Sequence, residues 1–259
     1  MRRIAFINEK GGTGKTTLAV NVAAYLAQRH ARRVLLVDLD TQGHAGKVLG
    51  LDVRGLRPHA FHLLSDPAVP LDAVIRPTGI ERLSIIPSYK EMSELPAVAA
   101  GDPRRMFRLA DRLARLDGRF DAVVFDSPPS MGLTTFNILC AATEVVVPVA
   151  LTYLSLDGCA EVVKTVEGVS SEHGRPDLRV TRVVPTLYRK TALADAILAK
   201  LHEHFAGAVS PVPLSFSVKI DEAQSHGQTI WEYAPRCKGA ELLAQIAEDL
   251  WSAGARAAG

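Results

Sequence analysis

The sequence predicts an α/β fold in which a doubly wound, mainly parallel sheet carries helices on both faces. Three observations lead to this prediction. Short runs that are apolar throughout alternate with segments of helical periodicity along the whole chain. Such runs are typical of strands in a parallel sheet, because helices cover both faces of the sheet. A glycine-rich loop also stands between the first apolar run and the first helical segment.

Six runs are expected to be strands. They are Arg3–Asn8, Arg33–Asp38, Leu83–Pro87, Asp121–Asp126, Glu144–Val149 and Val180–Pro185. Apolar spacing of three and four predicts the helices. They cover residues 16–29, 103–117, 132–142, 156–173, 192–206 and 239–252. Residues 51–80 contain several prolines and no firm period, so no element is assigned there. Without a repeat or a linker, we expect residues 1–259 to form a single domain.

Composition limits the possible functions. The net charge of +2 provides no global basic field, so any nucleic-acid contact requires a local patch of Lys and Arg. Cys140, Cys159 and Cys237 form no CxxC pair, which favours free thiols in a reducing cytosol. The first expected strand begins almost at Met1, and no apolar run approaches the ~20 residues that span a bilayer. We therefore expect a cytoplasmic protein.

The loop Lys10–Thr17 reads KGGTGKTT and follows the first expected strand. It fits the end of the phosphate-binding pattern G-x-x-x-x-G-K-[ST], although Glu9 replaces the first glycine. Glycines allow backbone N–H groups to surround phosphate oxygens, and the following helix adds its positive end. Lys15 would reach the β- and γ-phosphates, and the Thr16 hydroxyl would hold Mg²⁺. The nucleotide-binding residues expected from the motif are Lys10, Gly11, Gly12, Thr13, Gly14, Lys15, Thr16 and Thr17.

Two further segments bring carboxylates to the same edge of the sheet. Asp38–Gly43 follows the second expected strand, and Asp126–Ser130 follows the fourth. Ligands of doubly wound sheets bind at the carboxyl ends of the strands. Either aspartate alone could equally be a turn or helix cap. Together with the loop they indicate one nucleotide site with a carboxylate near Mg²⁺.

Lys10 is a second lysine beside Lys15, and the two ammonium groups repel each other unless phosphate charge offsets them. Lys10 could act in its own site or reach into the site of a second subunit. In both cases it would supply positive charge where negative charge develops during phosphoryl transfer.

These three segments resemble the signature segments of the ParA/MinD family of deviant Walker A ATPases. The C-terminal third resembles the ParA (Soj-like) branch. The residues that carry this second likeness are Glu222-Ala223, Gly227, Ile230, Tyr233-Ala234-Pro235 and Lys238-Gly239-Ala240. The resemblance therefore covers nearly the whole chain.

The resemblance implies an ATP hydrolase that uses Mg²⁺ and forms a homodimer around two ATP molecules. Lys10 would contact the partner's ATP, and Lys15 would hold the phosphates of its own subunit. Thr16, Asp40 and Asp126 would lie at the metal, with Asp40 positioning the attacking water. The catalytic residues would then be Lys10, Lys15 and Asp40.

The resemblance also implies a cellular role. The ATP dimer would bind DNA without sequence preference and associate with the nucleoid. A ParB-like or other activating protein would stimulate hydrolysis, and repeated cycles would position a plasmid, a chromosome region or a protein cluster.

The chain departs from the family pattern at two places. Thr41 and His44 stand where proline and asparagine are common, and Ser215-Phe216-Ser217 replaces a Pro-Arg-Asn pattern. The first departure lies beside the expected switch. The second removes one basic residue from a segment that contacts adenine and DNA in the family.

The expected DNA contacts are Arg189, Lys190 and Lys219, by their match to family segments. A separate arginine stripe has a spacing of three and four and lies on one predicted helical face. Its members are Arg104, Arg108, Arg112, Arg115 and Arg119. The stripe is either a second basic surface or simply a solvated face.

Four other functions remain as alternatives. A membrane-associated ATPase of the MinD or flagellar-number type would usually end in a basic amphipathic helix, whereas this chain ends in a Gly/Ala-rich tail, so no membrane is expected. An iron–sulfur reductase of the nitrogenase type needs more cysteines than Cys140 near the site. A dethiobiotin-type ligase shares the fold, but the ParA-like C-terminal segment argues against it. A scaffold that only senses ATP is disfavoured because Lys15, Thr16, Asp40 and Asp126 are all present.

Overall fold

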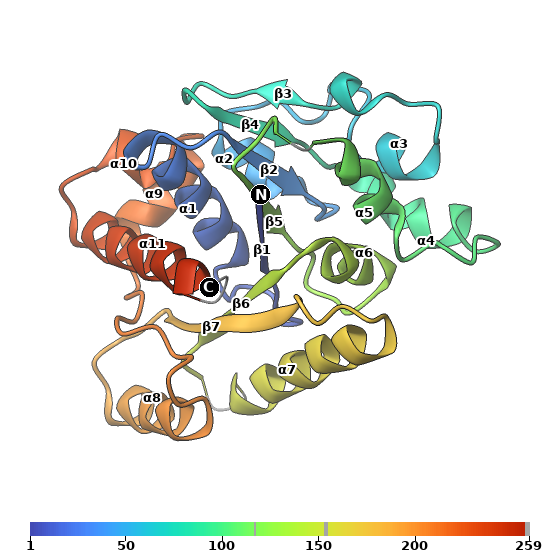
Figure 1. Cartoon of the computed structure of the whole chain (residues 1–259). Helices are drawn as coiled ribbons and strands as arrows, with labels where there is room; N and C mark the ends of the chain where they lie inside the picture. Colours follow the sequence, from blue (N-terminus) through green and yellow to red (C-terminus); the bar gives the residue numbers. More distant parts are fainter. Residues whose placement is uncertain (117, 153–154, 257–259) are drawn as a thin grey trace.

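The computed structural model describes residues 1–116, 118–152 and 155–256 (Figure 1). Seven strands form one sheet in the order β3-β4-β2-β5-β1-β6-β7. They are β1 (Arg2–Phe6), β2 (Val34–Asp38), β3 (Arg76–Pro77), β4 (Leu83–Ile86), β5 (Ala122–Asp126), β6 (Glu144–Ala150) and β7 (Arg179–Thr186). Neighbouring strands run parallel except β3 and β4, which are antiparallel. The predicted fold class is confirmed.

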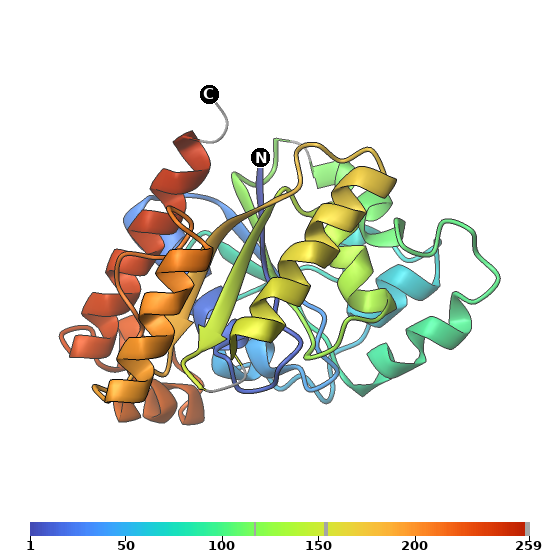
Figure 2. The same ribbon diagram turned by 90° about the horizontal axis from the view of Figure 1, so that it is seen from below.

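Helices cover both faces of the sheet. One layer contains α1 (Lys15–Arg29), α2 (His44–Val48), α9 (Val218–Ser225), α10 (Ile230–Tyr233) and α11 (Lys238–Arg256). The other contains α3 (Ala60–Ser65), α4 (Leu95–Val98), α5 (Arg108–Leu113), α6 (Leu133–Ala141), α7 (Ser155–Glu172) and α8 (Ala192–His204). Figure 2 shows α7 and α8 in front of β6 and β7. None of the helices in the described part of the chain is both long and apolar enough to cross a bilayer.

The central strands are apolar throughout because each packs against both helical layers. β2 and β5 are buried at every position. Successive side chains point to opposite faces, so Leu35 and Val37 join one apolar cluster while Val34 and Leu36 join the other. This two-sided burial is the reason that the strands were predictable.

The six expected strands and five of the six expected helices lie within a few residues of their predicted bounds. The helix expected at 103–117 is shorter, since α5 begins at Arg108 and a 3-10 turn, η3 (Ala114–Leu116), follows it. Residues 103–107 form turns instead, in which the N–H groups of Arg105 and Phe107 bond carbonyl oxygens three residues back, and the Asp102 side chain accepts the N–H of Arg104. The unassigned segment 51–80 contains α3, the 3-10 turn η1 (Leu71–Ala73) and β3.

The arginine stripe neither forms a free basic surface nor faces only water. Arg108 donates to the carbonyl oxygen of Leu64 at 2.8 Å, and Arg112 donates to that of Pro67 at 2.8 Å. Two further members form ion pairs, Arg104 with Asp111 and Arg119 with Asp72. Arg108, Arg112 and Arg119 therefore fasten α3 and the irregular segment after it to α5 and to the turn before β5.

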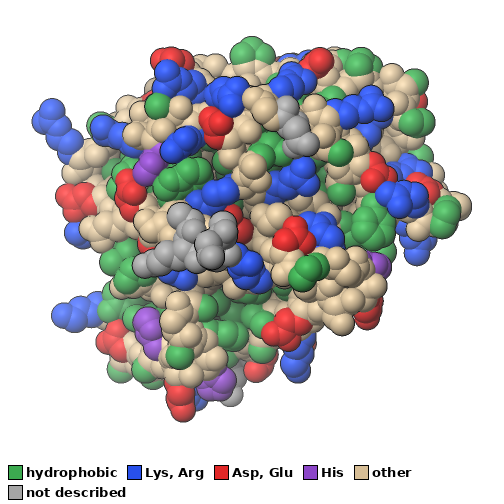
Figure 3. Space-filling view, viewed as in Figure 1, with side chains coloured by type: hydrophobic (Ala, Val, Ile, Leu, Met, Phe, Trp, Pro, Cys, Tyr) green, Lys and Arg blue, Asp and Glu red, His purple; other side chains and the backbone are tan. Residues whose placement is uncertain are grey.

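Other arginines contact the C-terminal turns of helices at the amino end of the strands, where β1 begins. Arg2 donates to the carbonyl oxygens of Leu250 and Trp251 in the last two turns of α11 and pairs with Glu144 at 2.6 Å. Arg175 donates to the carbonyl oxygen of Ala142, the C-cap of α6. Cations near helix C-termini oppose the helix dipole, and Arg175 also satisfies a carbonyl that the helix leaves free. Figure 3 shows Lys and Arg side chains gathered on this face.

Candidate nucleotide site

The loop between β1 and α1 surrounds a cavity at the carboxyl end of the sheet. Gly12 and Gly14 have φ angles of 71° and 86°, which residues with a Cβ rarely adopt. The cavity has a volume of about 320 Å³. Its lining residues are Gly11, Gly12, Thr13, Gly14, Lys15, Thr16, Thr17, Asp40, Gln42, His44 and Pro129. The fold thus brings together the loop and the segment after β2, as predicted.

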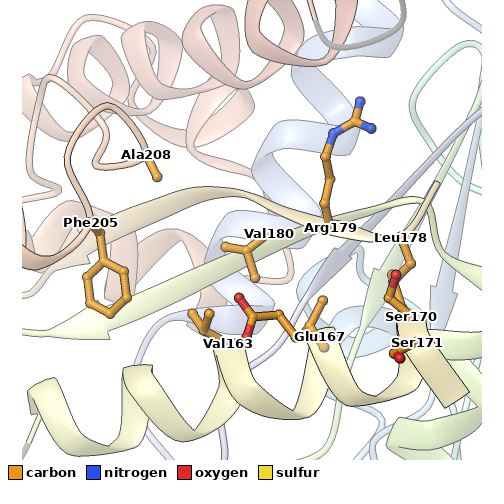
Figure 4. A pocket seen from close by; sticks show the side chains of 10 residues that line it. Val163, Glu167, Ser170, Ser171, Leu178, Arg179, Val180, Phe205 and Ala208 are labelled. Carbon is orange, nitrogen blue, oxygen red and sulfur yellow. The ribbon is translucent and has the colours of Figure 1, made fainter. Parts of the chain in front are cut away.

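A larger cavity of about 410 Å³ lies elsewhere, between α7, the start of β7 and the turn at Phe205–Ala208 (Figure 4). Its walls are mostly apolar, with Val163, Val166 and Val180 among them. It has no glycine-rich backbone to surround a phosphate, so the smaller loop cavity is the candidate nucleotide site.

Buried side chains from other elements hold the loop in place. The Thr186 hydroxyl at the end of β7 donates to the carbonyl oxygen of Thr13 at 2.8 Å. The Asn8 side chain accepts the N–H of Lys10 at 2.9 Å and donates to the carbonyl oxygen of Pro148 at 2.7 Å. Neither Thr186 nor Asn8 could be selected from the sequence. The bond between Asn8 and Lys10 is local, but Asn8 meets Pro148, and Thr186 meets Thr13, only through the pairing of β1, β6 and β7.

Lys15 is buried within the loop. Its Nζ donates to the carbonyl oxygen of Lys10 at 2.9 Å. Burial lowers the pKa of Lys15, while the charges of Asp126 and Asp40 act in the opposite direction. A buried ammonium group that has carboxylates nearby is well placed to pair with phosphate oxygens.

Lys10 is the one predicted nucleotide contact that does not line the loop cavity. Its side chain lies along the first turns of α7, where a Cβ on Gly158 would be 3.4 Å from the Lys10 Cε. The two lysines of the loop therefore point to different places.

Asp126 ends β5 and is fully buried. Neither of its carboxylate oxygens has a hydrogen-bond partner of normal geometry among the described residues. Burial has the largest effect and raises the pKa of Asp126, which lies at about 7. The charge of Asp40 also raises this pKa, whereas the nearby Thr16 hydroxyl and the charge of Lys15 lower it. An unpartnered buried carboxylate is costly, so this position suits a bound cation.

Asp38 has a structural role that the sequence did not reveal. Its carboxylate accepts the N–H of Asp40 at 3.0 Å and that of Ala45 at 3.1 Å, which joins the end of β2 to α2. Burial raises its pKa well above the usual range, and the charge of Asp126 raises it further. Asp40 remains at the cavity wall, where its Oδ1 accepts the N–H of Gln42 at 3.0 Å.

The predicted metal ligands Thr16, Asp40 and Asp126 fit Mg²⁺. The described part of the chain contains no group of three or more His, Cys, Asp or Glu that could hold a metal ion without help. Mg²⁺ usually takes one or two carboxylates and completes its shell with water and substrate phosphates. The orphaned oxygens of Asp126 are the observation that favours a cation here.

Both departures from the family pattern lie at the site. The Thr41 hydroxyl is 3.4 Å from the Asp40 Oδ1, and His44 lines the loop cavity. Ser215–Ser217 lines a small cavity of about 40 Å³ that shares Gly14 and Thr17 with the loop cavity.

The predicted DNA contacts lie on one exposed rim. The N–H of Phe216 donates to the carbonyl oxygen of Tyr188 at 3.1 Å, which brings the segments before Arg189 and Lys219 together. The Arg189 guanidinium stacks on the Phe216 ring at 4.5 Å, and the Lys219 Nζ pairs with Glu222 at 2.7 Å. Lys190 is exposed next to Arg189. The structure thus brings the three cations to one side, but an acid already neutralises one of them.

Residues 1–180 match the family described as AAA domain. The chain is 39% identical to the chromosome-partitioning ATPase Soj of Thermus thermophilus, over 96% of this chain and 95% of the relative. It is also 34% identical to the sporulation initiation inhibitor protein Soj of Bacillus subtilis, over 95% of this chain and 97% of that relative. A structure of cobyrinic acid a,c-diamide synthase from Mycobacterium smegmatis, with a bound ATP analogue and magnesium, superimposes on this chain with a TM-score of 0.85 and 30% sequence identity. The superposition covers 98% of this chain and 96% of that structure.

The fold and the loop site define a P-loop ATPase whose cofactors are ATP and Mg²⁺. The chain belongs to the ParA/MinD family of deviant Walker A ATPases and is a ParA-like partition ATPase.

Proposed function

We propose that the chain forms a homodimer around two ATP molecules and that this dimer binds DNA without sequence preference. A ParB-like or other activating protein then stimulates ATP hydrolysis, and the cycle positions a cargo on the nucleoid in the cytoplasm. The observation that carries the proposal is the placement of Lys10. The rest of its loop lines one cavity, whereas Lys10 extends away from that cavity toward α7.

Within one subunit, the residues divide the work of hydrolysis. Lys15 offsets phosphate charge from inside the loop, and Asp126 and Thr16 hold the metal. Mg²⁺, when bound, stabilises the negative charge of the phosphates. Asp40 lies at the cavity wall, where its carboxylate can orient a water molecule. Lys10 of the other subunit adds positive charge that a single subunit lacks.

The curated relatives support a role in partition. Chromosome-partitioning ATPase Soj and two chromosome partitioning proteins named ParA align with 96–97% of this chain at 31–39% identity. We assign DNA binding to Arg189, Lys190 and Lys219, since all three are exposed on one rim.

The apolar side of α11 argues against a membrane-bound alternative. Leu243, Ile246 and Leu250 of this helix are buried in the cluster that also contains α1. A helix that binds lipid would need this side free to enter the membrane.

Replacing Asp40 by Ala tests the proposal. The variant should bind ATP with Mg²⁺, form dimers that light scattering detects, and be retained on DNA. It should release no phosphate. Lys10→Ala is the matched variant, which should bind ATP and remain monomeric. Monomeric Asp40→Ala protein in ATP would refute the dimer proposal.

The likeness to cobyrinic acid a,c-diamide synthase offers a second function, which the same assay addresses. ATP turnover by the wild-type protein should not change when cobyrinic acid and ammonia are added together, and it should change when DNA and the activating protein are added. A turnover that requires cobyrinic acid would instead favour the synthase.

A further inference from the structure

Gln224 reaches the phosphate loop from α9, more than two hundred residues away in sequence. Its side-chain Nε2 donates to the Thr17 hydroxyl oxygen at 2.8 Å. Thr17 lines both the loop cavity and the small cavity at Ser215–Ser217, so its hydroxyl lies where the two cavities meet.

This contact constrains the proton of the Thr17 hydroxyl. A hydroxyl carries one proton and can also accept hydrogen bonds. Because its oxygen accepts from Gln224, the proton must point elsewhere. Within residues 1–116, 118–152 and 155–256, no hydrogen bond from the Thr17 hydroxyl to an acceptor is found. The hydroxyl is therefore available as a donor toward the cavities.

We propose that Gln224 is a positioning residue that orients the Thr17 hydroxyl as a donor to the phosphates of the bound nucleotide. The inference rests on the proposed function, because it assumes that the nucleotide occupies the loop cavity. It adds to that function a residue outside the three signature segments. The bond from Gln224 excludes one direction of the O–H before the nucleotide arrives, so binding has less rotation of the hydroxyl left to restrict.

Gln224 is not needed to hold the helices together. The N–H of Ile230 donates to the Asn21 side chain at 3.0 Å, and the Trp231 indole donates to the Asn21 carbonyl oxygen at 2.9 Å. Ile220 and Ala223 of α9 are also buried in the apolar cluster that contains α1. A change confined to the Gln224 amide should therefore leave the packing intact.

A double-mutant cycle tests the proposal. Gln224→Leu keeps a similar size but cannot donate, so affinity for ADP with Mg²⁺ should fall about 3- to 10-fold, the range of one hydrogen bond. Gln224→Glu should weaken affinity more, since a carboxylate would accept the Thr17 proton. In a Thr17→Val background, Gln224→Leu should have almost no further effect. Gln228→Leu, at an exposed position just beyond α9, is the matched control and should bind like the wild type.

Isothermal titration with ADP and Mg²⁺ gives the affinities, and thermal unfolding without nucleotide confirms that each variant folds. Independent effects of Thr17→Val and Gln224→Leu, or an unchanged affinity in Gln224→Leu, would overturn the inference. Those results leave the proposed function standing. A wild-type protein that binds ATP but never dimerises would contradict the proposed function and leave the Gln224 cycle unaffected.

Discussion

Asp38 and Asp126 lie directly opposite each other in the register of β2 and β5, and both are buried. Their environments differ even so. The Asp38 carboxylate accepts two backbone N–H groups, whereas the carboxylate oxygens of Asp126 accept none of normal geometry among the described residues. The Asp38 carboxylate is therefore satisfied by the protein itself, and that of Asp126 remains available for a cation. This difference separates the structural aspartate of the site from the aspartate that we propose as the metal ligand.

The first prediction concerns pH. Burial raises the pKa of Asp126 from 3.8 to about 7, so the folded protein keeps a proton that the unfolded chain releases in this window. Its contribution to stability is thus present at low pH and is lost as the pH rises from about 4 to about 7. Asp126→Asn should reduce this loss and leave the part that comes from Asp38, whose pKa burial also raises. Thermal unfolding of nucleotide-free wild type and variant across the window measures it.

The comparison between the two proteins is needed because His59 titrates in the opposite sense. Burial lowers the pKa of His59 to about 4, so its contribution to stability rises with pH over part of the same window. The difference between wild type and Asp126→Asn cancels this effect. Two unfolding curves that stay parallel from acid to neutral pH would show that Asp126 does not titrate there.

The second prediction concerns the arginine stripe. Arg112→Ala removes donors to the carbonyl oxygens of Pro67 and Val69, so the free energy of unfolding should fall by about 1–2 kcal/mol. Urea denaturation measures the change. Arg115→Ala is the control, because Arg115 is exposed and makes no ion pair within the described chain. A stripe that served DNA instead would lose DNA affinity in both variants without losing stability.

The elements that the sequence predicted are those that local pattern determines. β2 and β5 are continuous apolar runs, and the helices α1 and α7, which follow β1 and β6, repeat with a clear period. β3 has only two residues, and Arg76–Pro77 carries no alternation that could reveal it. α9 buries only Ile220 and Ala223, too few for a periodic signal. The start of α10 could have been found, because Thr229 and Glu232 form a capping box.

The site divides in the same way. The glycine loop and the strand-end aspartates are local motifs, so they were predictable. Thr186 and Gln224 act on the loop from β7 and α9, and the bond from Asn8 to Pro148 joins the end of β1 to β6, so these contacts depend on register and helix packing. Residue types alone could not separate Asp38 from Asp40, since both follow an apolar strand. Their hydrogen bonds separate them.

The third prediction tests the support of the loop from β7. Thr186→Val has nearly the same shape but cannot donate to the buried carbonyl oxygen of Thr13. Leaving that oxygen unpaired should cost about 1–3 kcal/mol of stability and weaken ATP binding. Chemical denaturation and nucleotide titration measure the two effects. Thr165→Val removes a solvent-exposed hydroxyl bond to the carbonyl oxygen of Glu161 within α7 and should change neither stability nor ATP binding. Equal effects in both variants would contradict a specific role for Thr186.

The fourth prediction separates a DNA contact from a general charge effect. Lys219→Glu should weaken retention on DNA and lower its salt dependence, while ATP turnover without DNA stays intact. Arg82→Glu provides a control with the same change of charge. Arg82 is exposed and pairs with Glu81 at 3.5 Å. It lies just before β4, at the amino ends of the parallel strands, whereas Arg189 follows the carboxyl end of β7 at the opposite edge of the sheet. Salt-titrated DNA binding should distinguish the two variants, and an equal loss in both would mean that net charge, rather than the rim of Arg189 and Lys190, determines the affinity.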